Sequence, residues 1–204
     1  MMNPTQQDIQ NFINFDSWFN EFKTKPGGRY YTFKAALNLM LQQEDSRLIL
    51  ETGSVRQEND WTAGYSTYIF GRFCKQYDKQ LFTIDSSSEN LEMAKRVTSD
   101  FKDNITYVLS DSVAYLEKFS RPIDLLYLDS LDCPTEDGSD ASAAQKHTLK
   151  ELLSVYKQLT PYAGVMIDDN DWDNGGKSLL AKRYLFENNW RCVLDERQSL
   201  WIRR

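Results

Sequence analysis

The chain has few histidines and cysteines and lacks long apolar runs, which are the features typical of zinc-binding, disulfide-rich and membrane-spanning proteins. It has one histidine, three cysteines and five prolines among 204 residues. One histidine excludes a zinc centre built on several histidines, and three widely spaced cysteines fit neither a disulfide framework nor a zinc site. No apolar run approaches the roughly 20 residues of a membrane span, and the amino terminus lacks the pattern of a signal peptide. We therefore expect a cytoplasmic protein without membrane association.

Basic residues are also in deficit, since 24 Lys and Arg face 30 Asp and Glu, for a net charge of −6. Binding of nucleic acid in bulk needs an excess of positive charge to neutralise phosphates, so we do not expect it. The hydrophobic fraction of 41% is enough for a packed core, and the length fits one domain over residues 1–204. We expect a small-molecule substrate as the partner, and the sequence leaves open whether the chain forms a homo-oligomer.

From residue 46 onward, short apolar runs alternate with segments of helical spacing. This alternation is typical of a doubly wound, mostly parallel α/β sheet. The last two strands are too close for a helical crossover, so we expect an antiparallel hairpin with its turn near Asp195. The predicted strands are 47–51, 80–84, 105–109, 123–128, 163–168, 190–195 and 198–203, and the predicted helices are 65–77, 88–100, 111–118, 141–159 and 176–188.

Residues 1–45 precede the first strong strand and carry two stretches of helical spacing. Apolar residues recur every three or four positions over 8–24 and again over 31–44. The sequence Lys25-Pro-Gly-Gly28 separates the two stretches. We expect a helical appendage that packs on the α/β core of residues 46–204 and could cover the crevice of that core.

Four of the predicted parallel strands stop at an acidic residue. Glu51 ends the first strand, Asp85 the second, Asp129 the fourth, and Asp168-Asp169 the fifth. In open α/β sheets, ligands bind outside the carboxyl ends of the strands. These carboxylates are therefore expected to converge on one crevice that binds a hydroxyl-rich or cationic ligand.

The first strand leads into a loop and a helix start that could hold this ligand. Gly53 and Ser54 follow Glu51, and Gly64-Tyr-Ser66 opens the next helix. Glycine lets backbone approach a ligand, and a helix start offers free N–H groups. The alternative is a plain strand-to-helix turn.

The ends of the second and third strands suggest contacts to a nucleoside. Asp85, followed by Ser86, suits a bidentate grip on ribose hydroxyls. Asp111-Ser112 after the third strand could bind an adenine amino group or could equally cap the helix that begins there.

The order and spacing of these segments over 47–204 resemble the class I S-adenosylmethionine-dependent methyltransferases, which have a Rossmann-like sheet. Small O-methyltransferases of the catechol and macrocin types are the most similar, because Glu51-Thr-Gly53, Gly64-Tyr-Ser66, Asp129 and Asp169-Asn170 match their motifs. The resemblance implies transfer of a methyl group from S-adenosylmethionine to a small-molecule acceptor, at oxygen. The cofactor-binding residues it implies are Glu51, Gly53, Ser54, Gly64, Ser66, Asp85, Ser86, Asp111, Ser112 and Asp129.

A metal ion is a further implication of the catechol-type resemblance. In those enzymes the matching trio holds Mg²⁺, which binds the acceptor hydroxyl, so the role falls here on Asp129, Asp169 and Asn170. Carboxylate and amide oxygens suit this hard cation. The alternatives are that Asp129 contacts the cofactor and that Asp169-Asn170 forms a turn. Because the carboxylates crowded here would repel one another, we expect either a cation or nearby Lys and Arg side chains.

His147 and Asp129 are the candidate catalytic residues. His147 follows the loop after the fourth strand and could be a general base for the acceptor hydroxyl, although a surface or capping histidine is the alternative. Asn174-Gly-Gly-Lys177 is read as a turn, with Lys177 as a lesser candidate for contact with an anionic substrate. Trp61 and Trp172 belong to the core or stack on an aromatic acceptor.

Two other functions remain open from the sequence. A nucleotide-sugar enzyme can use a similar sheet, whereas a nicotinamide cofactor is disfavoured because the Gly-x-Gly-x-x-Gly motif is missing. A non-catalytic binding module with the same fold is the other alternative, since a fold does not determine a function.

Overall fold

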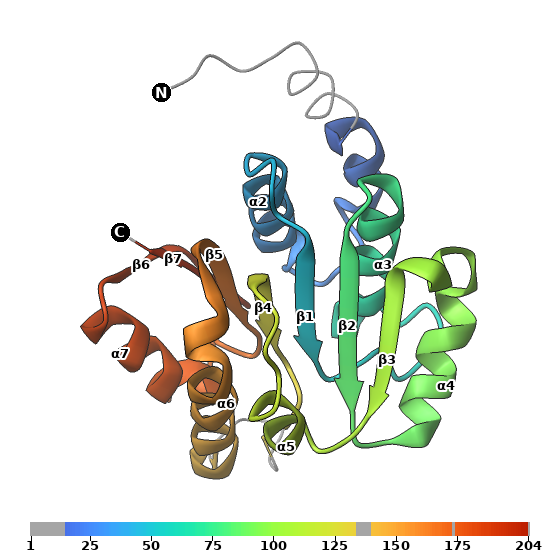
Figure 1. The fold of residues 1–204 in the computed structure, drawn as a ribbon. Coiled ribbons are helices and arrows are strands. Elements are labelled where there is room, and N and C mark those ends of the chain that lie inside the picture. The colour runs from blue at the N-terminus through green and yellow to red at the C-terminus, as the bar shows by residue number, and fades with distance from the viewer. Residues whose placement is uncertain (1–14, 134–139, 173, 204) are drawn as a thin grey trace.

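The computed structural model describes residues 15–133, 140–172 and 174–203. Seven strands form one sheet in the order β3-β2-β1-β4-β5-β7-β6 (Figure 1). Strands β1 to β5 are parallel, and β7 runs antiparallel to both β5 and β6. The strands are β1 (Leu48–Thr52), β2 (Gln80–Asp85), β3 (Ile105–Leu109), β4 (Ile123–Leu128), β5 (Leu159–Ile167), β6 (Trp190–Asp195) and β7 (Ser199–Arg203). The predicted α/β sheet with a carboxyl-terminal antiparallel hairpin is confirmed.

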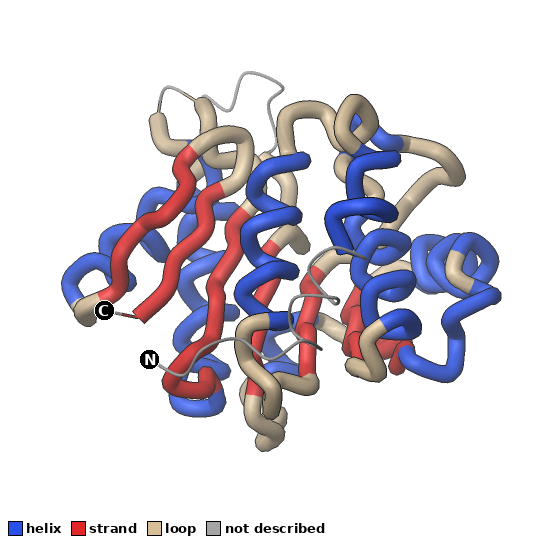
Figure 2. Tube along the Cα trace, turned by 90° about the horizontal axis from the view of Figure 1, so that it is seen from above, coloured by secondary structure: helices blue, strands red, loops and turns tan. Residues whose placement is uncertain are grey.

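Helices cover both faces of this sheet (Figure 2). The α-helices are α2 (Tyr30–Leu41), α3 (Ser66–Gln76), α4 (Ser88–Val97), α5 (Ser112–Leu116), α6 (Ser142–Val155) and α7 (Leu179–Glu187). Short 3-10 turns are η1 (Asn20–Phe22), η2 (Trp61–Ala63), η3 (Ser99–Asn104), η4 (Tyr156–Gln158) and η5 (Gly176–Ser178). None of the helices in the described part of the chain is both long and apolar enough to cross a bilayer.

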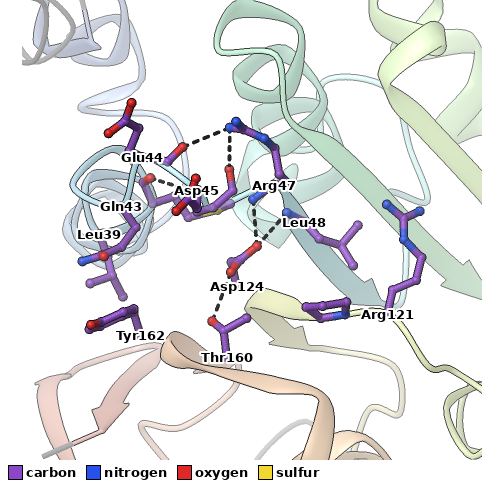
Figure 3. A pocket seen from close by; sticks show the side chains of 13 residues that line it. Leu39, Gln43, Glu44, Asp45, Arg47, Leu48, Arg121, Asp124, Thr160 and Tyr162 are labelled. Atoms are coloured by element: carbon purple, nitrogen blue, oxygen red, sulfur yellow. Dashed lines mark hydrogen bonds between the residues drawn. The ribbon is translucent and has the colours of Figure 1, made fainter.

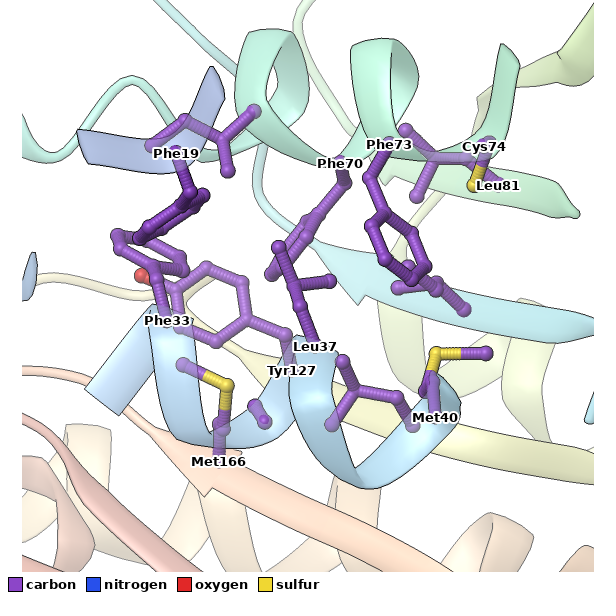
Figure 4. Packing of buried hydrophobic residues seen from close by; sticks show 14 of the residues in the cluster. Phe19, Phe33, Leu37, Met40, Phe70, Phe73, Cys74, Leu81, Tyr127 and Met166 are labelled. Carbon is purple, nitrogen blue, oxygen red and sulfur yellow. The ribbon is translucent and has the colours of Figure 1, made fainter. Parts of the chain in front are cut away.

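The core on one face is rich in aromatic rings from α2, α3 and the amino-terminal segment (Figure 4). Phe33 of α2 and Phe70 of α3 both pack edge-on or tilted against the ring of Tyr127, with centroids 5.9 and 5.4 Å apart. Each fully buried side chain of this size contributes roughly 1.5–3 kcal/mol through burial of apolar surface. The packing therefore fixes Tyr127, and its hydroxyl extends toward the carboxyl ends of the strands.

The core on the other face joins the sheet to α5, α6 and α7. Leu116 of α5, Leu152 of α6 and Leu185 of α7 are fully buried in it. Strand β1 is buried along its whole length, as the continuous apolar run Leu48-Ile-Leu predicts for a parallel strand covered on both faces. The central strands are thus packed on both faces, which determines where the loops that follow them begin.

Several element boundaries differ from the sequence expectation. The helix predicted over 141–159 ends at Val155, because Tyr156–Gln158 tightens into a 3-10 turn and Leu159 already pairs with Ile123 in the sheet. The first turn of the helix predicted over 176–188 is likewise 3-10. The helix predicted over 8–24 lies partly outside the described residues; 15–19 are helical.

The amino-terminal segment is integrated with the core. Phe15, Phe19 and Phe22 are buried in the aromatic core, and α2 packs against β4, β5 and β7. The described part of this segment therefore packs on the sheet. All three cysteines are free.

Candidate functional site

The site lies where the strand order reverses, at the carboxyl ends of β2, β1 and β4. Strand β1 pairs with β2 on one side and with β4 on the other. The ladder continues past the strand ends, because the N–H of Gly53 donates to the carbonyl of Ile84 (2.8 Å) and that of Asp129 to Thr52 (3.0 Å). This reversal is the place where ligands bind in doubly wound sheets.

Gly53 is required at its position by the approach of the loop after β4. Its φ of +81° lies in the left-handed region, and a Cβ built there would overlap the carbonyl of Asp129. Only glycine meets both conditions without strain. The turn after β1 and the turn after β4 therefore touch, which brings Asp129 beside the loop that begins with Ser54.

Two adjoining cavities open at this junction. One, of about 150 Å³, is bordered by Gly53, Ser54, Val55, Arg56, Asp60, Ala63, Tyr65, Ser66, Asp85, Ser86, Ser87, Asn90, Asp129 and Ser130. The other, of about 130 Å³, is bordered by Gly53, Ile84, Asp85, Ser86, Asp111, Ser112, Ser130, Leu131 and His147. Because four of these residues border both, the cavities form a continuous concave surface that passes over Asp85.

Asp85 is held by neutral donors. One carboxylate oxygen accepts the backbone N–H of Ser54 (2.9 Å) and its hydroxyl (2.8 Å), and the other accepts the N–H of Ser87 (2.8 Å). Asn90 donates to both oxygens at 3.2–3.3 Å. The carboxylate therefore borders the cavities, and no Lys or Arg side chain in the described part of the chain forms a salt bridge with it.

Glu51 lies behind the first cavity and does not border it. It is fully buried and accepts the hydroxyls of Ser66 (2.5 Å) and Thr67 (2.9 Å), at the start of α3. Burial raises the pKa of Glu51 to about 7, against the hydrogen bonds from Ser66, Thr83 and Thr67. Its effect on the cavity is thus exerted through Ser66, which borders the cavity, and through the position of α3.

The second cavity contains the predicted adenine-side residues. Asp111 caps α5 by accepting the N–H of Ala114 (2.8 Å), as one sequence interpretation predicted, and it also borders the cavity. Ser112 and His147 are joined by a hydrogen bond of 3.0 Å between Oγ and Nε2. The hydrogen bond to Glu151 raises the pKa of His147, and partial burial opposes this. The general-base role predicted for His147 stays a prediction.

The acids after β5 are paired with cations instead. Asp168 is fully buried, and Nε of Arg29 donates to both of its carboxylate oxygens, at 3.0 and 2.8 Å. Tyr127 donates to the same carboxylate. Arg29 reaches this position past Gly64, whose φ is +98° and where a Cβ would come within 2.9 Å of the arginine side chain. Gly64 therefore leaves room for the Arg29 side chain and does not border either cavity.

Asp129 and Asp169 share the ammonium group of Lys177. Its Nζ lies 2.5 Å from Asp129 Oδ1, 3.2 Å from Asp169 Oδ2 and 3.9 Å from Asp132 Oδ1. Burial would lower the pKa of Lys177, but the surrounding carboxylates raise it above its usual value. Burial raises the pKa of Asp129, and Lys177 opposes that shift. The other Asp169 oxygen accepts Arg197 at 2.6 Å.

Asn170 faces away from this cluster. Its amide nitrogen donates to Asp195 (2.6 Å) and to the carbonyl of Glu196 (2.8 Å), and its amide oxygen accepts Ser178 (2.6 Å) and Lys182 (2.8 Å). Because two donors and two acceptors fix which amide atom is which, the oxygen is oriented toward α7. Asn170 thus anchors the turn between β6 and β7 to the start of α7.

A larger cavity, of about 540 Å³, lies at the opposite edge of the sheet (Figure 3). Leu48, Asp124 and Thr160, near the amino ends of β1, β4 and β5, border it. Asp124 is occupied there by the N–H groups of Arg47 (2.8 Å) and Leu48 (3.0 Å) and by the hydroxyl of Thr160 (3.1 Å). The predicted site residues lie at the other edge.

Comparison with known proteins assigns the chain to a family. The sequence profile described as a methyltransferase domain matches residues 61–170, more than half of the chain. The chain belongs to this family. Membership implies an S-adenosylmethionine-dependent methyltransferase, as the resemblance predicted. No curated protein sequence matches the chain significantly.

Solved structures share the fold of this methyltransferase domain at low sequence identity. A methyltransferase from Geobacter sulfurreducens is 15% identical with a TM-score of 0.60, and the match covers 100% of this chain and 92% of that one. A TDP-rhamnose 3′-O-methyltransferase of calicheamicin biosynthesis is 13% identical, with a TM-score of 0.61 and coverage of 100% and 96%. A Podospora anserina methyltransferase with S-adenosylhomocysteine (SAH) bound is 11% identical, with a TM-score of 0.57 and coverage of 100% and 98%.

The methyltransferase domain does not present the implied Mg²⁺ ligands to one point. Asp129 and Asp169 come together as predicted, whereas Asn170 points elsewhere. Asp132 contributes the third carboxylate, and oxygens of Asp129, Asp132 and Asp169 all lie within 4.8 Å of one another. The ammonium group of Lys177 lies among these carboxylates. The arrangement therefore already contains a positive charge and does not fit a divalent metal ion.

Sequence reasoning missed several residues of the site. No sequence signal points to Arg29 or Arg197, although the carboxylates crowded after the fifth strand predict a nearby cation or nearby Lys and Arg side chains. For Lys177 the sequence predicts only contact with an anionic substrate. Trp61 packs on Phe22, Tyr65 and Tyr68, as the core interpretation expected, and the guanidinium of Arg197 lies 5.9 Å from the ring centre of Trp172.

Proposed function

We propose that this methyltransferase transfers the methyl group of S-adenosylmethionine to a hydroxyl group of a small molecule. The observation that carries the proposal is the continuous surface formed by the two cavities, with Asp85 between them. A nucleoside with an amino-acid arm matches a surface of this shape, because its ribose lies between two chemically different ends. The TDP-rhamnose 3′-O-methyltransferase among the structural neighbours supports the choice of oxygen as the acceptor atom.

Each part of the methyl donor has a matching set of residues. The ribose hydroxyls fit the carboxylate of Asp85, and the adenine fits the cavity of Asp111 and Ser112. The amino-acid arm fits the cavity beside Gly53 and Ser66, at the start of α3. The donor's sulfonium supplies a methyl group that is already activated, so the residues of the chain need only bind and align the reactants.

Asp129 is proposed to orient the acceptor hydroxyl. It borders the first cavity, next to the place proposed for the amino-acid arm. Its Oδ1 is occupied by Lys177, whereas Tyr127 lies 3.2 Å from Oδ2. The single phenolic proton of Tyr127 is directed at the closer Asp168. One lone pair of Asp129 Oδ2 therefore remains available to accept a hydrogen bond from the acceptor.

Calorimetry with SAH on the wild-type chain and on Asp85→Ala tests the donor site. We expect SAH to bind the wild-type chain and to bind the variant about 10- to 150-fold more weakly, because a hydrogen bond to a charged group contributes roughly 1.5–3 kcal/mol. Asp103→Ala, at an exposed carboxylate of η3, is the matched control and should bind normally. Because Asp85 also orients Ser54, Asp85→Asn and a melting curve distinguish lost binding from lost structure.

Unchanged SAH affinity in a folded Asp85→Ala protein would contradict the ribose role. A panel of hydroxylated acceptors, including sugar nucleotides, then tests transfer itself through release of SAH. SAH binding without turnover of any acceptor would favour the non-catalytic binding module instead.

A further inference from the structure

The acidic cluster after β4 and β5 has its own cation built into the chain. Lys177 has no exposed surface, and its ammonium nitrogen lies closest to two carboxylates, those of Asp129 and Asp169. Exposed ion pairs contribute little and exchange freely, but a fully buried ammonium group depends on its partners. The fold therefore determines the position of the Lys177 side chain, unlike that of an exposed lysine.

The backbone around Lys177 is shaped to place it there. Gly176 has a φ of +52°, and a Cβ built on it would collide with the carbonyl oxygen of Asp169. That same carbonyl accepts the N–H of Lys177 at 3.2 Å. Asp169 itself has a φ of +47°, which non-glycine residues rarely adopt. The two turns are therefore locked together, and Lys177 can enter the cluster only because residue 176 lacks a side chain.

Each described carboxylate in this half of the site is paired with a cationic side chain of the protein. Asp168 pairs with Arg29, and Asp169 pairs with Arg197 as well as with Lys177. Asp132 pairs with Arg56 at 2.6 Å. A divalent cation added to this arrangement would meet the ammonium group of Lys177 at short range, and like charges this close repel strongly where water is excluded.

We propose that the ammonium group of Lys177 stands in the place of a divalent cation, so that this methyltransferase aligns its acceptor without a metal. The inference rests on the proposed function for the reaction it serves, but the metal-binding behaviour is a property of the apoprotein. Lys177 is a positioning residue: it holds Asp129 Oδ1, so that Oδ2 faces the cavity and accepts the acceptor hydroxyl. The acceptor is then held by hydrogen bonds and need not chelate a metal.

Titration with Mn²⁺, followed by electron paramagnetic resonance of the full chain, tests this inference without an acceptor. We expect the wild-type chain to show no binding at this cluster below about 1 mM, the weak end of protein sites for hard cations. Lys177→Ala removes the ammonium group but leaves the three carboxylates, so it should gain Mn²⁺ affinity by at least about tenfold, equivalent to 1.4 kcal/mol. Adding Asp169→Asn should abolish the gain. Lys146→Ala, at an exposed lysine of α6, is the control and should behave as wild type.

Sub-millimolar Mn²⁺ binding by the wild-type chain that Asp129→Asn abolishes would overturn the inference, because the metal would then displace Lys177. A folded Lys177→Ala protein that gains no affinity would overturn it as well. Lys177→Met, which keeps the volume of the side chain, replaces the alanine variant if a melting curve shows that the latter is unfolded. SAH calorimetry on the same samples separates this outcome from a failure of the proposed function, because donor binding and Mn²⁺ binding are independent readouts.

Discussion

The two halves of the crevice use the same kind of residue in opposite electrostatic settings. On the β1–β2 side, Glu51 and Asp85 are held by hydroxyl, amide and backbone N–H donors. On the β4–β5 side, Asp168 and Asp169 are held by arginine and lysine side chains. Glu51 and Asp85 lie at the carboxyl ends of the neighbouring strands β1 and β2, and Asp168 and Asp169 directly follow the carboxyl end of β5.

The two kinds of partner suit different roles for the two sides of the crevice. Neutral donors leave the charge of Asp85 available to a ligand with hydroxyl groups, and they can be exchanged for ligand donors at little cost. Buried ion pairs are different, because removing one partner leaves an uncompensated charge in a low-dielectric environment. We therefore infer that the β1–β2 side binds and releases the donor, whereas the β4–β5 side is a fixed frame for the acceptor.

The largest effect is expected from Arg29→Ala, on the charge-paired side. The change strands the fully buried carboxylate of Asp168, so the free energy of unfolding should fall by about 3–5 kcal/mol in urea denaturation. Lys95→Ala breaks the exposed pair with Glu92 and should cost less than about 1 kcal/mol. A loss in Arg29→Ala no larger than that of the control would mean that the two sides do not differ in this way.

A smaller, pH-dependent effect is expected from Glu51→Gln, on the neutral-donor side. Burial raises the folded pKa of Glu51 from its usual 4.5 to about 7. A raised pKa means that the wild-type chain binds this proton more tightly when folded, so the contribution is present at low pH and is lost as pH rises from about 4.5 to 7. The glutamine variant lacks this loss. The free energy of unfolding of the variant relative to wild type should therefore be higher at pH 8 than at pH 5, by about 1–3 kcal/mol.

Thermal melts of both proteins at pH 5 and pH 8 check the Glu51 prediction. If the stability difference between the two proteins is the same at both pH values, Glu51 is ionised in the folded state. The β1–β2 side would then hold a buried charge as the β4–β5 side does, and the two sides would differ less.

The smallest effect is expected from His147→Gln. The hydrogen bond to Glu151 raises the folded pKa of His147 above 6.5, and partial burial opposes it. The ion pair therefore stabilises the fold fully below the unfolded pKa and is lost as pH rises through the folded value. The melting temperature of wild type should exceed that of the variant more at pH 6 than at pH 9. A constant difference would show that His147 acts only as a neutral hydrogen-bond partner of Ser112.

The sheet and the β1–β2 side of the crevice could be predicted largely from the sequence. Strands such as Leu48–Thr52 are continuous apolar runs, and Asp85 and Asp129 follow directly from where those runs end. Each signal is local, because an apolar run and the acid that ends it are adjacent in the sequence. A parallel sheet then brings the carboxyl ends of its strands to one edge. The same locality explains why the boundaries near Val155 and Leu159 were misplaced, since pairing with β4 and not helical spacing decides where β5 begins.

The sequence by itself determined that acids gather at one edge of a parallel sheet and that their mutual repulsion requires cations. Only the tertiary structure decided which cations these are. Arg29 precedes the first strand, Lys177 follows the fifth and Arg197 lies in the final hairpin, so no local spacing connects them to Asp168 and Asp169. Their meeting depends on the order of strands in space and on glycines at 64 and 176 that allow close approach, and neither is encoded in periodicity.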